Sequence, residues 1–153
     1  MVCLGNICRS PLAEGILRNK LTNHPSGVEV DSAGTGAWHA GETPDKRAIR
    51  IAKKYHVDIS GLRARQFNVS DFDEFDKIFV MDQSNERDVL ALARNASDKS
   101  KVQLFLSVNP SSRVINVPDP WYGGEEGFEK VYKMLEAACE ALIIELGTKE
   151  KSK

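Results

Sequence analysis

The chain has 153 residues, of which 41% are hydrophobic and 28% charged, and its formal net charge is −1 at pH 7. This length is typical of one globular domain with its own core. The near-zero charge disfavours a nucleic-acid-binding protein, which usually has a basic face. No apolar run approaches the roughly 20 residues that span a bilayer, and no signal-peptide pattern is present, so we expect a cytoplasmic protein without a membrane partner.

The predicted elements begin at the first residues. The first strand has room only for Met1 and Val2, whereas strands usually contain about five residues. A helix is predicted over residues 11–23, with Ser10 as its cap, and a short strand over residues 28–30, closed by a turn. A second helix is expected over residues 44–55.

Strands and helices continue to alternate in the second half. We predict strands at residues 77–81 and 102–106, and helices at residues 84–96 and 125–146. Ser84 or Asp82 is the expected cap of the third helix; Asp82 also follows a strand, where ligand sites of open α/β sheets lie. The alternation predicts one α/β domain over residues 1–153 with a parallel sheet, and a tail that is disordered from about residue 148.

The segment Cys3–Pro11 (CLGNICRSP) places a Cys, five residues, an Arg and a Ser directly before a helix. Such a loop directs backbone N–H groups at one point, and the helix dipole adds positive potential there. Gly5 and Asn6 readily take the positive φ of a tight anion-binding turn, and Arg9 adds a planar fork that can hold two phosphate oxygens. These features predict a site for a tetrahedral oxyanion.

Cys3 is the candidate nucleophile of this loop. A helix N-terminus and a neighbouring Arg favour the thiolate form of a cysteine, and attack on phosphorus would form a phosphocysteine intermediate. Ser10 is placed to hydrogen-bond that thiolate. Because cysteine is more often a small buried residue, the hypothesis depends on the whole combination of the Gly-Asn pair, Arg9 and the Ser-Pro helix start.

Asp119, in the segment VPDPWYGG, is the candidate proton donor and acceptor. A departing phenolate needs a proton, and the attacking water must then lose one. Trp121 and Tyr122 could form one wall of a slot for a phenyl ring, and Trp38 with His39 the opposite wall. The alternative is a common Asp-Pro turn whose aromatic neighbours pack on the core. The three scattered histidines do not predict a structural zinc site, and three cysteines do not predict a disulfide framework.

Five segments together resemble a known family: VCLGNICRSPLAEG, DSAGT, ARQF, DFDEFDKIFVMDQSN and PDPWYGG. They resemble the low-molecular-weight protein tyrosine phosphatases over nearly the whole chain. The resemblance implies a three-layer α/β fold, with a four-stranded parallel sheet flanked by helices on both faces and a phosphate-binding loop between the first strand and the first helix. It also implies hydrolysis of phosphotyrosine in protein substrates, with no metal and no cofactor.

Carried to matching positions, the family's roles make Cys3 the nucleophile, Arg9 the phosphate clamp and Asp119 the general acid and then base. The supporting residues would be Leu4, Gly5, Asn6, Ile7, Cys8, Ser10 and Ser32, and the ring pocket would be lined by Leu4, Trp38, Trp121 and Tyr122. Cys8 matches a cysteine that forms a reversible disulfide with the nucleophile in the family; from the residues alone, a plain packing role is as good an interpretation. Many members have a His, bonded to the loop's Asn, where this chain has Leu62.

Three alternative functions stay open. Arsenate reductases on this fold relay electrons through two further mid-chain cysteines, and this chain has none between Cys8 and Cys139. Phosphoarginine phosphatases tend to have Thr where Ile7 stands. A non-catalytic phosphate-binding module would keep the loop without turnover. The oligomeric state cannot be read from the sequence.

Overall fold

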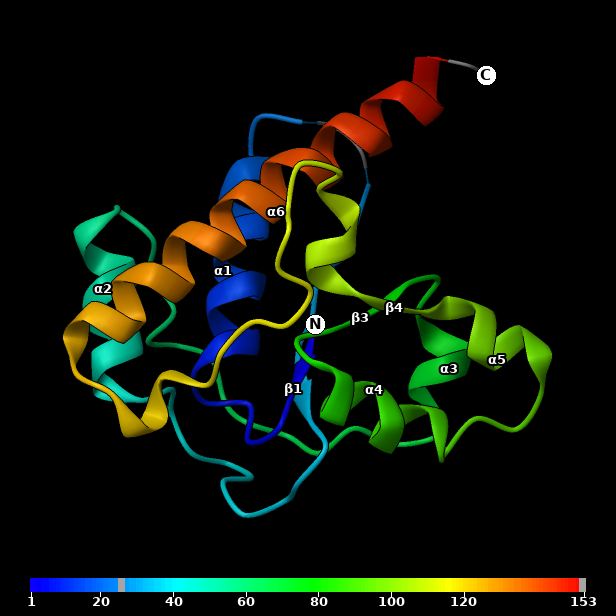
Figure 1. The fold of residues 1–153 in the computed structure, drawn as a ribbon, viewed down its shortest axis with the longest axis horizontal. Helices are drawn as coiled ribbons and strands as arrows, with labels where there is room; N and C mark the ends of the chain where they lie inside the picture. The colour runs from blue at the N-terminus through cyan, green and yellow to red at the C-terminus, as the bar shows by residue number, and fades with distance from the viewer. Residues whose placement is uncertain (25–26, 152–153) are drawn as a thin grey trace.

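A single parallel sheet forms the centre of the protein, in a computed structural model that describes residues 1–24 and 27–151, with side chains up to residue 147. Its strands lie in the order β2-β1-β3-β4; they are β1 (Val2–Cys3), β2 (Ala33–Gly34), β3 (Ile78–Val80) and β4 (Val102–Leu104). The helices are α1 (Arg9–Leu21), α2 (Lys46–Lys54), α3 (Asp71–Glu74), α4 (Gln83–Leu90), α5 (Ala96–Lys101) and α6 (Glu125–Lys151), with 3₁₀ helices η1 (Phe105–Val108) and η2 (Pro120–Tyr122). The predicted four-stranded parallel α/β fold is confirmed (Figure 1).

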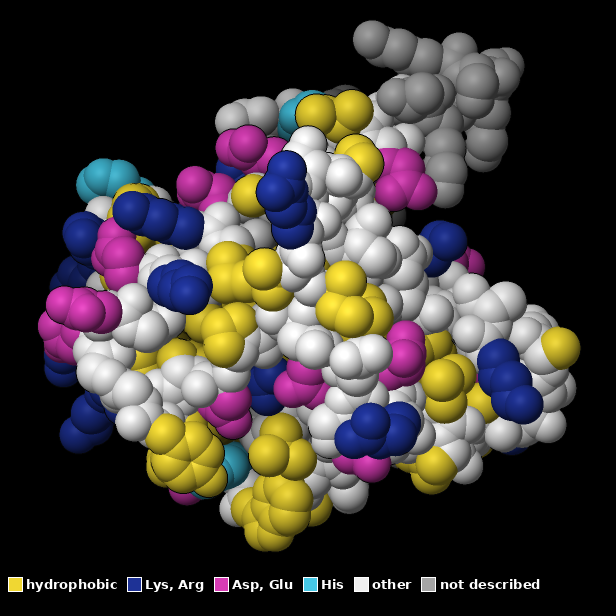
Figure 2. Space-filling model, in the orientation of Figure 1, with side chains coloured by type: hydrophobic (Ala, Val, Ile, Leu, Met, Phe, Trp, Pro, Cys, Tyr) yellow, Lys and Arg dark blue, Asp and Glu magenta, His cyan; other side chains and the backbone are white. Residues whose placement is uncertain are grey.

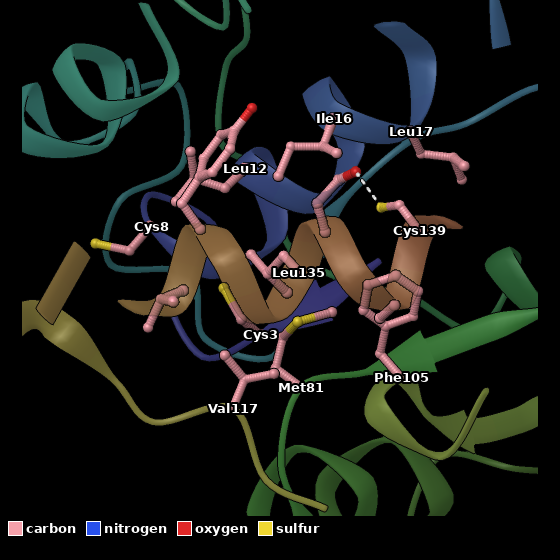
Figure 3. Close-up of a cluster of buried hydrophobic side chains, with 14 of the residues drawn as sticks. Cys3, Cys8, Leu12, Ile16, Leu17, Met81, Phe105, Val117, Leu135 and Cys139 are labelled. Atoms are coloured by element: carbon pink, nitrogen blue, oxygen red, sulfur yellow. Dashed lines mark hydrogen bonds between the residues drawn. The ribbon is translucent and has the colours of Figure 1, made fainter. Parts of the chain in front are cut away.

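Helices cover both faces of the sheet because successive strand side chains point to opposite sides. Val2, Ile78 and Val80 pack in one cluster with Phe72 of α3 and Val89 of α4. The strand residues that point the other way, Cys3 and Phe79, join a larger core with α1, α2 and α6. Met81, which directly follows β3, belongs to the same core. Figure 3 shows part of this second core, where α1 and α6 lie against each other. The three layers follow from this alternation.

The two-residue strand β1 is stable because it lies inside the sheet. On one side, the N–H groups of Ala33 and Thr35 donate to the carbonyls of Met1 and Cys3 at 3.0 and 2.9 Å. On the other side, the N–H of Met81 donates to the carbonyl of Val2 at 3.0 Å. The pairing with β2 extends into the following loop, where Gly36 N–H donates to the carbonyl of Leu4 at 2.9 Å. The start of the loop is therefore held by strands on both sides.

Two sequence-based predictions in the first third of the chain are wrong. The strand expected at residues 28–30 is absent, and β2 lies at Ala33–Gly34, in the segment predicted to be a turn. The partners of β2 are Val2 and Cys3, so its position is set by pairing across the sheet and not by its own residues. Helix α1 begins at Arg9, so Ser10 lies inside the helix and does not cap it.

The third predicted helix, residues 84–96, is also different in the structure. It ends at Leu90, and a separate helix α5 follows. Ser84 is not the cap: the carboxylate of Asp82 accepts the N–H of Asn85 at 2.8 Å, as expected for Asp82. The side chain of Asn95 caps α5 in the same way. The caps Asp82 and Asn95 therefore start two separate helices, although the polar stretch between them has no Gly or Pro that would predict a break.

The C-terminal elements follow the sequence more closely. β4 ends at Leu104, two residues earlier than expected, where η1 begins. α6 begins at Glu125 as predicted, and the apolar residues that helical spacing places along one face are all buried: Phe128, Val131, Leu135, Ala138 and Leu142. The tail expected to be disordered from about residue 148 includes the last turn of α6; residues 152–153 lie outside the described residues. Within the described part of the chain, no helix is long and apolar enough to cross a membrane.

Candidate active site

The loop from Cys3 to Arg9 turns from β1 into α1 around the sulfur atom of Cys3. Asn6 has φ of +57°, as predicted, and its N–H donates to Cys3 Sγ at 3.2 Å. Gly5, expected to share this conformation, does not have a positive φ. Its lack of a side chain serves another purpose, because a Cβ at Gly5 would lie 3.1 Å from Cδ2 of His39. The loop thus curls around the sulfur, with only one residue in the left-handed region.

The side chain of Asn6 has three hydrogen-bond partners, two of them buried serines. Its Nδ2 donates to Ser10 Oγ at 2.8 Å and to Ser32 Oγ at 2.9 Å, and its Oδ1 accepts the N–H of Arg65 at 3.0 Å. The Ser32 hydroxyl in turn donates to the buried carboxylate of Glu14 at 2.6 Å. Asn6 therefore has a full set of partners in this chain without a histidine at residue 62.

Glu14 anchors the inner end of this network. Its side chain is 1% exposed, and burial raises the pKa of its carboxyl group, against the opposing effect of the Ser32 hydrogen bond. Its second oxygen lies 2.8 Å from Nη2 of Arg18. The chain of contacts from Glu14 through Ser32, Asn6 and Ser10 ends at Cys3, whose Sγ lies 2.9 Å from Ser10 Oγ.

The three cysteines are free and buried, and they differ in surroundings. Cys3 lies at the centre of the loop and lines its pocket. Burial raises the pKa of the Cys8 thiol well above its usual range and that of Cys139 to about 12. Cys139 lies in the core between α1 and α6, with Ala13 O 3.9 Å from its sulfur (Figure 3).

Arg9 is 3% exposed and is oriented by Asp82, which the sequence suggested as a helix cap at a sheet edge where ligand sites lie. Its Nη1 donates to Asp82 Oδ2 at 2.6 Å and to the carbonyl of Val117 at 3.0 Å. Asp82 thus caps α4 with one oxygen and holds Arg9 with the other. The available sequence signal was the position of Asp82 at the carboxyl end of β3.

Asp119 lies near the other terminal nitrogen of the Arg9 guanidinium group. Its Oδ1 accepts the N–H of Trp121 at 3.0 Å and so caps η2, while its Oδ2 lies 3.8 Å from Arg9 Nη2. Pro120 is buried, and the Asp119 side chain stays 34% exposed. A buried proline and a capping contact fix the residue while its second oxygen faces the site.

These groups line one pocket with a volume of about 130 Å³. Ten of the predicted site residues line it: Cys3, Leu4, Gly5, Ile7, Cys8, Arg9, Trp38, Asp119, Trp121 and Tyr122. The three others, Asn6, Ser10 and Ser32, are not among the lining residues and form the buried support described above.

Aromatic side chains form the rim of the pocket. Trp38 is 73% exposed and Tyr122 90%, so they do not pack in the core. Figure 2 shows hydrophobic side chains gathered at the lower edge of this face, over the loop of residues 35–42 and near η2. His39 also lines the pocket, with its ring 6.0 Å from that of Trp121. The rim suits a flat apolar group above the loop from Cys3 to Arg9.

Three features therefore meet here: a loop that curls around the Cys3 sulfur, a guanidinium held by Asp82, and an aromatic rim. Among residues 1–24 and 27–151, no group of three or more His, Cys, Asp or Glu side chains is arranged to hold a metal ion.

Comparisons with known proteins agree with this geometry. A family model described as low molecular weight phosphotyrosine protein phosphatase matches residues 1–152. The low molecular weight phosphotyrosine protein phosphatase of Schizosaccharomyces pombe is 43% identical, over 88% of this chain and 86% of its own. The low molecular weight protein-tyrosine-phosphatase of Streptomyces coelicolor is 42% identical, over 93% of this chain and 88% of its own.

A solved structure extends the likeness to three dimensions. The crystal structure of a protein tyrosine phosphatase from Entamoeba histolytica superposes with a TM-score of 0.91 at 38% identity, covering 97% of this chain and 96% of that one. The family match spans every element that carries the pocket. The chain belongs to the low molecular weight phosphotyrosine protein phosphatases.

Proposed function

We propose that this phosphatase hydrolyses phosphotyrosine through a phosphocysteine intermediate, without a metal, using Cys3, Arg9 and Asp119. One observation carries the proposal: the thiol, the guanidinium and the carboxylate line the same pocket of about 130 Å³. A nucleophile, an oxyanion clamp and a proton donor are together sufficient for phosphate transfer to a cysteine.

In the first step, Cys3 attacks phosphorus and the bond to the phenolic oxygen breaks. The Nη1 atom of Arg9 is bonded to Asp82 and Val117, which leaves Nε and Nη2 for the phosphate oxygens. Asp119, protonated, gives its proton to the departing phenolate oxygen, so the product is a neutral phenol. The phosphoryl group is now bonded to sulfur.

In the second step, water attacks the phosphocysteine, and Asp119, now ionised, takes the proton from that water. The sulfur leaves as a thiolate, with Ser10 Oγ at 2.9 Å to donate a hydrogen bond to it. Release of inorganic phosphate restores the starting state. Each atom and proton is then accounted for with these residues alone.

The rim supports an aryl substrate. Exposed Trp38 and Tyr122 stand at the mouth, and Leu4 and Ile7 add apolar surface below. A phenyl ring would be held between these side chains, whereas a phosphoserine has no ring to make those contacts. Arsenate reduction through a cysteine relay is less well supported, because Cys139 lies in the core and does not line the pocket.

The test is hydrolysis of a phosphotyrosine peptide in the presence of a metal chelator. We expect Cys3→Ser to abolish turnover and Asp119→Ala to lower kcat by about two to four powers of ten, the usual contribution of a general acid. Both tryptophans of the chain line the pocket, so their fluorescence reports oxyanion binding independently of turnover. We expect Cys3→Ser to keep its response to inorganic phosphate.

Full activity in Cys3→Ser, or activity only with added metal, would refute the mechanism. Binding of phosphate without turnover in the parent would instead support the non-catalytic alternative. The cytoplasmic location and the absence of a nucleic-acid partner stay predictions from the sequence.

A further inference from the structure

Arg47 of α2 lies directly behind the loop that carries Asp119. Its Nη1 donates to the carbonyls of Trp121 and Gly123 at 3.3 and 3.1 Å, and its Nη2 also donates to Trp121 O at 3.3 Å. The guanidinium carbon lies 5.5 Å from the centre of the Trp121 ring and 4.7 Å from that of Phe128. One side chain therefore contacts both the backbone and a side chain of η2.

The other edge of the same guanidinium is fixed by Asp45. Nε and Nη2 of Arg47 each donate to a different carboxylate oxygen of Asp45, at 3.1 Å. Burial alone would raise the pKa of Asp45, but hydrogen bonds from Arg47 outweigh it and hold the pKa below its usual range. The pair is thus ionised and bidentate, which is the geometry that fixes a guanidinium most firmly.

Asp45 is itself attached to the loop from Cys3 to Arg9, the proposed phosphate loop. Its N–H donates to the carbonyl of Ile7 at 2.8 Å, and its carboxylate caps α2 by accepting the N–H of Arg47 at 2.8 Å. A continuous path therefore runs from Ile7 through Asp45 and Arg47 to the carbonyls on either side of Tyr122. It joins the loop that would hold the phosphate to the loop that would hold the acid.

We propose that Arg47 is a positioning residue that sets the place of the Asp119 carboxyl group over the phosphate loop. The proposal rests on the proposed role of Asp119 as general acid. Without Arg47, three hydrogen bonds to the carbonyls of Trp121 and Gly123 and the contact with the Trp121 ring are lost. The segment Asp119–Gly123 then keeps the buried Pro120, the Asp119–Arg9 contact and the His39–Trp121 ring contact. The phosphate site keeps Cys3, Arg9 and the loop N–H groups. The expected defect is therefore in proton transfer and not in phosphate binding.

Two substrates separate these effects. Phenyl phosphate has a poor leaving group that needs the proton, whereas 4-nitrophenyl phosphate releases a stable phenolate that needs it far less. We expect Arg47→Met to lower kcat/KM for phenyl phosphate about 10- to 100-fold, the loss that follows from displacing a catalytic group by about 1 Å. For 4-nitrophenyl phosphate we expect a change within about threefold, and the fluorescence-detected affinity for inorganic phosphate should match the parent.

Arg50 provides the matched control. It lies one turn further along α2, pairs with Glu125 at the start of α6, and has no contact with the carbonyls of η2. Arg50→Gln should leave kcat/KM for both substrates unchanged. Arg47→Lys, which keeps the charge but lacks the planar fork, should show a smaller loss with the same leaving-group dependence, and it decides the question if Arg47→Met does not fold.

The Asp119→Ala variant serves as a background that separates the role of Arg47 from the proposed role of Asp119. There, adding Arg47→Met should cause no further loss with phenyl phosphate, because the group that it positions is gone. Equal losses with both substrates, or no loss in either Arg47 variant, would overturn the role of Arg47 while leaving that of Asp119 intact. If Asp119→Ala itself shows no leaving-group dependence, the proposed function fails and this inference fails with it.

Discussion

Replacing Gly34 by alanine changes one methyl group at the contact between β2 and the phosphate loop. A Cβ at Gly34 would lie 2.8 Å from the carbonyl oxygen of Leu4, 3.0 Å from C of Gly5 and 3.1 Å from N of Asn6. Contacts of 3.4–4 Å are ordinary, so the new atom is about half an ångström too close to three backbone atoms at once. None of these atoms can move by a simple rotamer change.

Strand β2 has little freedom to move away from the loop. On its outer side, Gly34 N–H donates to Arg65 O at 2.9 Å, and Gly34 O accepts the N–H of Phe67 at 2.7 Å. We therefore expect the loop to be displaced, by several tenths of an ångström around Asn6. Overpacking of this kind costs about 1–3 kcal/mol of unfolding free energy, and displacement of the oxyanion donors should lower kcat/KM about tenfold.

The assay is urea unfolding together with steady-state hydrolysis of 4-nitrophenyl phosphate. Gly61→Ala is the control: a Cβ there would have no atom within 4 Å, so we expect unchanged activity and a stability change below about 1 kcal/mol. If Gly34→Ala has the stability and kcat/KM of the parent, the argument that β2 holds the loop by close backbone contact is refuted.

Two further predictions concern stability. Phe72 is 0% exposed and packs edge-to-face on Phe67, with ring centres 5.3 Å apart, on the sheet face away from α1. Phe72→Ala should therefore lower the free energy of unfolding by about 3–5 kcal/mol and leave kcat unchanged. A loss below about 1 kcal/mol would contradict this core assignment. The pKa of Asp45 is lower in the folded state than the usual 3.8, so its stabilising contribution is present above the unfolded-state pKa and is lost as the pH falls through the folded-state pKa. The stability difference between the parent and Asp45→Asn, measured by urea unfolding, should therefore be constant above about pH 5 and shrink toward pH 2; a difference that grows with acidity would show the opposite sign.

The sequence alone was sufficient to predict a structural feature wherever the physical cause of that feature is local. The stripe along α6 and the buried face of α2 follow from helical spacing, and the left-handed Asn6 follows from its residue type. The combination of Cys3, Arg9 and Asp119 could also be assembled from residue chemistry, because each residue type has a role in the proposed phosphate transfer. The structure brings all three into one pocket.

Tertiary structure decided the features that depend on a distant partner. β2 lies at Ala33–Gly34 because β1 pairs there, although the more strand-like residues are at 28–30. The double use of Asp82 depends on Arg9, which is 73 positions away in the chain. Likewise, Arg47 contacts the carbonyls of Trp121 and Gly123, which are 74 and 76 positions away in the chain. Local sequence determined which chemical groups this protein has. Only long-range pairing, which no local pattern encodes, determined which groups hold them in place.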